Sequence, residues 1–167
     1  MSRKIQRPTH DEYVQFVEQE FNFLESDYGY RKSWDKKDAF RVIYSGRRIS
    51  VHIWGWGYGE SGHMSVNLGA EELPYRDLVT SKLPEHIGST GRQQLDDLRE
   101  HAYRLKTDCQ ELLTGDLSVL APYRPFPNAD ELWFNREFST IVELLEKVDK
   151  PLAGKWKTRY EYALKNA

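Results

Sequence analysis

Three stretches in the first half of the chain alternate apolar and polar residues, and this pattern constrains the fold most. They cover about residues 39–45, 48–54 and 63–69. Because successive side chains of a β-strand point to opposite faces, the alternation predicts strands with one apolar and one polar face. The connections between them are short, so neighbouring strands should pair in antiparallel order. The sequence therefore predicts an antiparallel meander, to which residues 29–34 add a fourth strand.

The registers of the two hairpins follow from matching apolar residues across the strands. The Gly-Arg pair at residues 46–47 can form a two-residue turn, since glycine at the first position favours type II′. Pairing Ser45 with Arg48 then places six apolar side chains on one face. These are Phe40, Val42, Tyr44, Ile49, Val51 and Ile53. Pairing Trp54 with His63 in the next hairpin keeps that face apolar.

Apolar residues at spacings of three and four predict helices before and after these strands. Thr9 and Glu12 fit a capping box at the start of the first helix. The predicted helices cover about residues 10–28, 91–114, 130–149 and 152–165. Consecutive strands followed by consecutive helices indicate the α+β class. We therefore predict a single domain over residues 1–167, with an N-terminal helix, a four-stranded antiparallel meander and three to four helices packed on the sheet.

Composition and charge narrow the classes of function. The net charge is −2 with acids and bases interspersed, so we expect no binding to nucleic acid or anionic lipid. The N-terminus has no apolar run, so we expect neither a signal peptide nor a membrane span, and a cytoplasmic protein. The single cysteine, Cys109, lies on the apolar stripe of the helix at 91–114. That position favours a core residue over a nucleophile, and one cysteine excludes an internal disulfide.

The sequence GYGESG at residues 57–62 satisfies the G-x-G-x-x-G pattern of phosphate-binding loops. In a dinucleotide-binding site, this turn leads into a helix whose N-terminus holds the phosphate. Here it leads into a predicted strand, and the motifs that accompany a kinase-type glycine loop are missing. We therefore interpret the segment as a hairpin loop whose glycines allow positive φ angles, and we expect no cofactor.

Large aromatic residues on and beside this loop suggest a binding site. The candidate partner-binding residues are Trp54, Trp56, Tyr58, Glu60, His52 and His63. Aromatic anchors beside a carboxylate are typical of protein-binding hot spots. The two histidines share the polar face of the sheet, but a third metal ligand is missing, so we expect no metal site. Alternatively, the two tryptophans fold back beneath the C-terminal helices as core residues.

Asp96, Asp97 and Glu100 form an acidic cluster on the exposed side of the helix at 91–114. Pairing with neighbouring arginines on a solvated face is one interpretation. The other is an acidic patch that complements the basic active-site cleft of a nuclease.

Two segments together resemble parts of a known class of proteins. FNFLESDYGYR, at residues 21–31, closes an amphipathic helix and enters a strand. LREHAYRLKTDCQELLTGDLSVL, at residues 98–120, is a long helix that ends in Leu-Leu-Thr-Gly-Asp. With the strands between them, the chain resembles small cytosolic bacterial immunity proteins, which accompany polymorphic toxins and neutralise them. The matching residues are helix faces and caps, so the resemblance implies architecture and a toxin as partner, but no binding residue.

These observations favour a non-enzymatic binding protein of the immunity type, which occludes the active site of a cognate toxin and has no catalytic residues. A second hypothesis is a small enzyme or small-molecule binder. Its pocket would lie between the polar sheet face and the C-terminal helices, with Glu60, His52 and His63 as titratable groups. A third hypothesis is a structural subunit whose aromatic loop is buried against a second copy of the chain.

Overall fold

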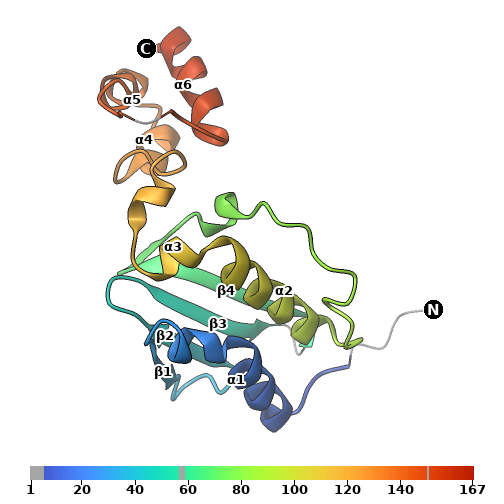
Figure 1. Cartoon of the computed structure of the whole chain (residues 1–167). Helices are drawn as coiled ribbons and strands as arrows, with labels where there is room; N and C mark the ends of the chain where they lie inside the picture. The colour runs from blue at the N-terminus through green and yellow to red at the C-terminus, as the bar shows by residue number, and fades with distance from the viewer. Residues whose placement is uncertain (1–5, 57–58, 150) are drawn as a thin grey trace, which may run out of the picture. The chain divides into compact units, whose positions relative to one another are not determined.

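The computed structural model describes residues 6–56, 59–149 and 151–167, and it has the predicted α+β class (Figure 1). Its residues form two compact units, where we expected one domain over residues 1–167. The first unit comprises Met1–Leu73 and Val79–Gly115, and the second comprises Pro74–Leu78 and Asp116–Ala167. Each unit buries apolar residues of its own, as a separately packed body requires.

The first unit contains the sheet. Its elements are α1 (His10–Ser26), β1 (Arg31–Trp34), β2 (Arg41–Ser45), β3 (Ser50–Trp56), β4 (Ser61–Leu68), β5 (Glu71–Glu72), α2 (Gln93–Asp108) and α3 (Gln110–Leu113). The strands pair in the order β1-β2-β3-β4-β5, and every pair is antiparallel. The predicted meander is therefore confirmed. The fifth strand was not predicted, because a strand of two glutamates is too short and too polar to show an alternating pattern.

The register of β3 and β4 is confirmed, whereas that of β2 and β3 is wrong by two residues. Trp54 pairs with His63, as predicted. Ser45 pairs with Ser50 and not with Arg48, so a four-residue loop replaces the two-residue turn. A shift of two residues keeps every side chain on its face, so the prediction of one apolar and one polar face still holds.

Gly46 does not have the backbone conformation that the two-residue turn requires. A type II′ turn needs a positive φ at its first central residue, and Gly46 does not have one. The glycine is needed for space, because a Cβ atom there would lie 2.6 Å from the ring of Tyr30. The hydroxyl of Tyr30 donates to the carbonyl of Leu113 at 3.0 Å, which holds the ring over the loop.

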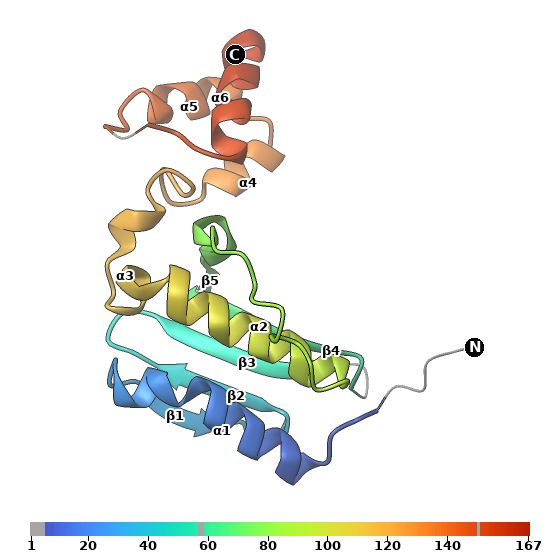
Figure 2. The same cartoon turned by 45° about the vertical axis from the view of Figure 1, so that its right-hand side comes forward.

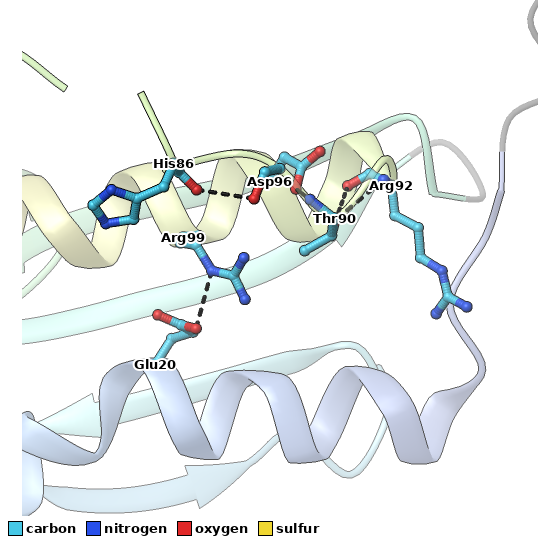
Figure 3. Close-up of polar contacts among 7 residues, drawn as sticks. Glu20, His86, Thr90, Arg92, Asp96 and Arg99 are labelled. Carbon is cyan, nitrogen blue, oxygen red and sulfur yellow. Dashed lines mark hydrogen bonds and ion pairs between the residues drawn. The ribbon is translucent and has the colours of Figure 1, made fainter. Parts of the chain in front are cut away.

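Helices α1 and α2 lie over the same face of the sheet (Figures 1 and 2). The apolar strand residues beneath them are buried, among them Val42, Tyr44, Val51, Ile53, Met64 and Val66. The predicted capping box starts α1, since the side chains of Thr9 and Glu12 each accept from the other's backbone N–H. Arg99 of α2 donates to Glu20 of α1 at 3.1 Å (Figure 3).

The predicted helix at 91–114 is two helices, α2 and α3, which divide at Cys109. The backbone of Cys109 leaves the helical region, with φ −116° and ψ 22°. Its side chain is 1% exposed, and burial raises the pKa of its thiol to about 12. The prediction that Cys109 is a core residue is therefore confirmed.

The second unit is helical. Its elements are η2 (Tyr75–Leu78), η3 (Leu117–Leu120), α4 (Ala129–Phe134), α5 (Phe138–Leu145) and α6 (Lys155–Asn166). The predicted helix at 130–149 divides into α4 and α5, because Arg136 between them has a left-handed φ of 58°. Helices α4, α5 and α6 bury a common core around Trp156. Of the helices predicted to follow the strands, α2 packs on the sheet within the first unit. No helix in the described parts of the chain is both long and apolar enough to span a membrane.

Candidate functional site

We call the face of the sheet opposite α1 and α2 the open face. None of the described helices of the first unit lies on it (Figures 1 and 2). The strand registers place on this face the side chains of Arg41, Ser50, His52, Trp54, Trp56, Ser61, His63, Ser65 and Asn67. The open face therefore collects four of the six residues predicted to bind a partner.

The two tryptophans of β3 surround one histidine of β4. The rings of Trp54 and His63, which are paired residues, stack at a centroid distance of 5.6 Å and an angle of 17°. The ring of Trp56 meets His63 edge to face at 6.5 Å. Trp54 is half-buried, whereas 66% of Trp56 is exposed. The alternative that both are core residues is therefore wrong for Trp56.

The histidines are each bonded within their own strand. Nε2 of His52 lies 2.9 Å from Oγ of Ser50, and Nε2 of His63 lies 2.9 Å from Oγ of Ser61. Nη2 of Arg41 lies 3.5 Å from Nδ1 of His52. Because a guanidinium only donates, Nδ1 accepts, and His52 is the neutral tautomer that carries its proton on Nε2. Burial lowers the pKa of His52, and the charge of Arg41 lowers it further.

The other two predicted residues fall between β3 and β4 in the sequence. Glu60 is exposed and lies outside the paired strands. Tyr58 lies outside the described residues. Across the described ranges, no group of three or more His, Cys, Asp or Glu side chains is placed to hold a metal ion.

The glycines of the loop have two different roles. Gly59 has a φ of +102°, which is the role we predicted for these glycines. Gly62 is needed for space instead, because a Cβ atom there would lie 2.4 Å from the carbonyl oxygen of Gln94. Its strand partner Gly55 is equally close to the amide of Gln94. The segment joins two strands, as predicted, and Gly62 together with Gly55 of β3 lets α2 approach the hairpin.

Gln94 and Asp97 hold this hairpin, and our sequence reasoning missed both roles. Gln94 is 2% exposed, and its Nε2 donates to the carbonyl of Ser61 at 3.2 Å. Oδ2 of Asp97 accepts from the backbone N–H of Gly62 at 3.0 Å. The signal for Gln94 was available, since it lies four residues before Leu98 and thus extends the buried stripe of α2 with a polar residue.

The acidic cluster is occupied by bonds within the first unit. Asp97 holds the hairpin, and Glu100 accepts from Arg104 at 2.9 Å, in line with the solvated pairing we considered. Asp96 accepts from the backbone N–H of Thr90 at 2.8 Å and thereby ties the preceding loop to α2 (Figure 3).

Two hollows include Trp56 in their linings. The larger, of about 430 Å³, lies on the open face, and its lining includes Arg41, His52, Trp54, Ser65 and Asn67. The smaller, of about 190 Å³, is lined by Arg7, Phe40 and Gln94 among others. Trp56, Gly55 and Asp38 contribute to both. An exposed indole that lines two recesses offers both an apolar anchor and places for the groups of a partner near it.

Fold and site together define an α+β protein with one face of its sheet packed and the other accessible and aromatic. Comparison of the chain with protein-family models, with curated proteins and with solved structures finds no match.

Proposed function

We propose that this chain is a non-enzymatic protein-binding protein and that the open face, at the loop end of β3 and β4, binds the partner. The observation that carries the proposal is the 66% exposure of Trp56 beside the stacked pair of Trp54 and His63. Tryptophan is usually well buried and is enriched where proteins bind one another. Its burial by a partner would remove a large apolar area from water, which favours association.

The resemblance to immunity proteins gives the partner class. In this proposal the partner is a cognate toxin, whose active site is occluded by the aromatic residues at the end of the hairpin. Binding would be stoichiometric, with no turnover. Truncation of a hot-spot tryptophan to alanine at the centre of such an interface costs about 2 kcal/mol or more of binding free energy.

The arrangement of the titratable groups supports this proposal over an enzyme. His52 and His63 each bond to a serine of their own strand, and Nδ1 of His52 faces Arg41. Glu60 lies in the loop, outside the paired strands. A Ser–His pair acts as nucleophile and base when a third group orients the histidine, and no carboxylate of the described residues does so for His52 or His63.

A small-molecule binder is the second candidate function. The observation that favours it is the hollow of about 430 Å³ on the open face, which is within the size range of ligand pockets. It combines an aromatic wall with a few polar groups, as such pockets do.

Affinity capture from a lysate of the source organism tests the proposed function. Wild type, Trp56→Ala and Phe134→Ala would be compared. Phe134 is a matched control, because it is a large aromatic residue, 76% exposed, in the second unit. We expect wild type and Phe134→Ala to capture one protein in stoichiometric amount and Trp56→Ala to lose it. Equal capture by all three proteins would contradict the assignment of the site, and no capture by wild type would contradict the function.

A further inference from the structure

Arg41 lines the larger hollow and forms no ion pair with a carboxylate of the described residues. It begins β2 and pairs with Trp54, so its side chain lies on the open face. Apart from the contact with Nδ1 of His52, no hydrogen bond or ion pair joins its guanidinium to the described residues, and its buried Nε has no acceptor. A guanidinium carries five N–H donors, so most of them have no acceptor among the described residues.

Four other arginines of the described residues each form an ion pair with a carboxylate. Arg92, Arg99 and Arg104 each donate to a glutamate, at 2.9, 3.1 and 2.9 Å. Arg159 pairs with Asp130 in the second unit. Since a partly buried charge is costly without a partner, a carboxylate from outside that paired with Arg41 would be stabilising.

Two aspartates lie near Arg41 but serve the loop between β1 and β2. Asp38 lines the hollow, and its Oδ1 accepts from the backbone N–H of Phe40 at 3.0 Å. Oδ1 of Asp35 accepts from the backbone N–H of Lys37 at 2.8 Å. Neither forms an ion pair with Arg41 among the described contacts, so the guanidinium is not neutralised by direct contact.

The rest of the lining adds donors and an apolar wall. Oδ1 of Asn67 accepts from the hydroxyl of Ser65 at 2.7 Å, which leaves the NH₂ group of Asn67 as a further donor. His52 is neutral in the tautomer that Arg41 imposes. The indole of Trp54, across from Arg41, supplies a flat apolar side. A cation that donates in a plane, a second donor and an aromatic wall together match a planar anion.

We propose that the hollow on the open face binds a carboxylate group, held by the guanidinium of Arg41 with the amide of Asn67 as second donor. The inference rests on the proposed function for the source of that group, which is an aspartate or glutamate side chain of the protein partner. Arg41 thus supplies specificity beside the apolar anchor Trp56. A partner surface that presents an acidic residue next to an apolar pocket would satisfy both.

Nuclear magnetic resonance titration of the ¹⁵N-labelled full chain with acetate tests the site itself. Acetamide, at equal ionic strength and pH, is the uncharged probe of the same shape. We expect acetate to shift the Nε–H resonance of Arg41 and the indole N–H of Trp54 saturably, and acetamide to bind at least about tenfold more weakly.

Three variants define the residue responsible. Arg41→Gln should abolish the acetate-dependent shift of Trp54. Asn67→Asp should weaken acetate binding through repulsion, and it keeps the test decisive if Arg41→Gln does not fold. Arg31→Gln is the matched control, because Arg31 is an exposed arginine on the same face, in β1, outside the hollow. Its acetate titration should equal that of wild type.

Two blocked tripeptides, Gly-Glu-Gly and Gly-Gln-Gly, distinguish a side chain from a free acid. Saturable shifts with acetate and with the glutamate peptide, but not with the glutamine peptide, support the proposal. If acetate binds but the glutamate peptide does not, the carboxylate does not come from a protein side chain, and that part of the proposal is overturned. Equal effects of acetate and acetamide, or unchanged acetate shifts in both Arg41→Gln and Asn67→Asp, overturn the site. The titrations do not depend on the capture experiment, so failure of the proposed function is seen separately.

Discussion

Gln94 of α2 donates from its buried side-chain amide to the backbone carbonyl of Ser61 in β4, at 3.2 Å. The same amide nitrogen lies 3.5 Å from the carbonyl of Trp56, at the other side of the hairpin. Since both neighbours are carbonyl oxygens, the orientation of the amide is fixed, with nitrogen toward the hairpin. One side chain of a helix on the packed face therefore holds the strand ends that carry the exposed Trp56.

Gln94→Glu should destabilise the first unit. The variant keeps the shape of the side chain but places carboxylate oxygens against two carbonyl oxygens in a buried site. We expect a loss of about 2 kcal/mol or more in the free energy of unfolding at pH 7, measured by urea denaturation. The control is Gln19→Glu, at an exposed position of α1, which should change the free energy of unfolding by less than about 0.5 kcal/mol. Equal losses in the two variants would refute the role given to Gln94.

Gly62→Ala tests the close approach of α2 to the hairpin. The new Cβ atom would lie 2.4 Å from the backbone oxygen of Gln94 and 2.6 Å from Cγ of Leu98. A backbone oxygen cannot rotate away, so we expect a loss of about 2–3 kcal/mol by urea denaturation. Gly69→Ala is the comparison, because Gly69 has a φ of +60° and open space around it. That variant carries only backbone strain, and a larger loss there than at Gly62 would refute the steric argument.

The alternation of apolar residues was sufficient to predict the sheet because it is local and strong. The pairing of Trp54 with His63 followed from it, and so did the residues on each face. The register of β2 and β3 did not follow, because it depends on Tyr30 packing over Gly46 from outside the hairpin. Contacts between residues far apart in sequence leave no periodic signal.

The candidate site was predictable in part for the same reason. Exposed aromatic residues at a strand end could be seen in the sequence, and Trp56 proved to be exposed. Arg41 was missed, because the sequence nearby contains Asp35 and Asp38, and only the structure shows that neither forms an ion pair with it. The division into two units was also missed, since no linker composition marks the change at residue 116.

Arg41→Gln should raise the pKa of His52. Burial lowers that pKa first, and the positive charge of Arg41 lowers it further, so removing the charge should move it back upward. Imidazole resonances followed against pH would measure the shift. His63 serves as an internal reference, since its ring contacts are with Ser61, Trp54 and Trp56. An unchanged titration of His52 in the variant would argue against the contact with Arg41.

The lowered pKa of His52 also sets the sign of a pH effect on stability. Below the ordinary value of 6.5, the unfolded state binds a proton that the folded state resists. The free energy of unfolding should therefore fall as pH decreases from 6.5 toward the folded-state pKa. His52→Gln should reduce this dependence in urea titrations at pH 7 and pH 5.5. An equal dependence in both proteins would show that His52 does not contribute to it.

Alkaline pH should destabilise the first unit through groups that are buried in their protonated form. Burial raises the pKa of the Cys109 thiol and of the Tyr30 hydroxyl to about 12 each, and it raises those of Tyr13 and Tyr44 as well. In the unfolded state these groups lose protons near their ordinary values of 9.0 and 10.0. Stability should therefore decline above pH 9, and it should be insensitive to these groups below it.

Thiol labelling with iodoacetamide tests the burial of Cys109, on which this prediction depends. At pH 8.5 folded protein should react with the reagent far more slowly than protein in 8 M urea, roughly in proportion to the population that opens. Ser89→Cys is the matched control, since Ser89 is exposed in the loop before α2 and should be labelled readily. Equal labelling rates of Cys109 and of the introduced thiol would show that the helix junction is open to solvent.

Trp56→Ala and Trp156→Ala should separate binding from folding. Trp56 is 66% exposed, so its truncation should change the free energy of unfolding by less than about 0.5 kcal/mol. Trp156 is fully buried in the core of the second unit, and its truncation should cost about 3–5 kcal/mol. Circular dichroism during urea denaturation measures both. A large loss with Trp56→Ala would mean that the side chain contributes to the fold, and then the loss of partner capture by that variant could not be assigned to the interface.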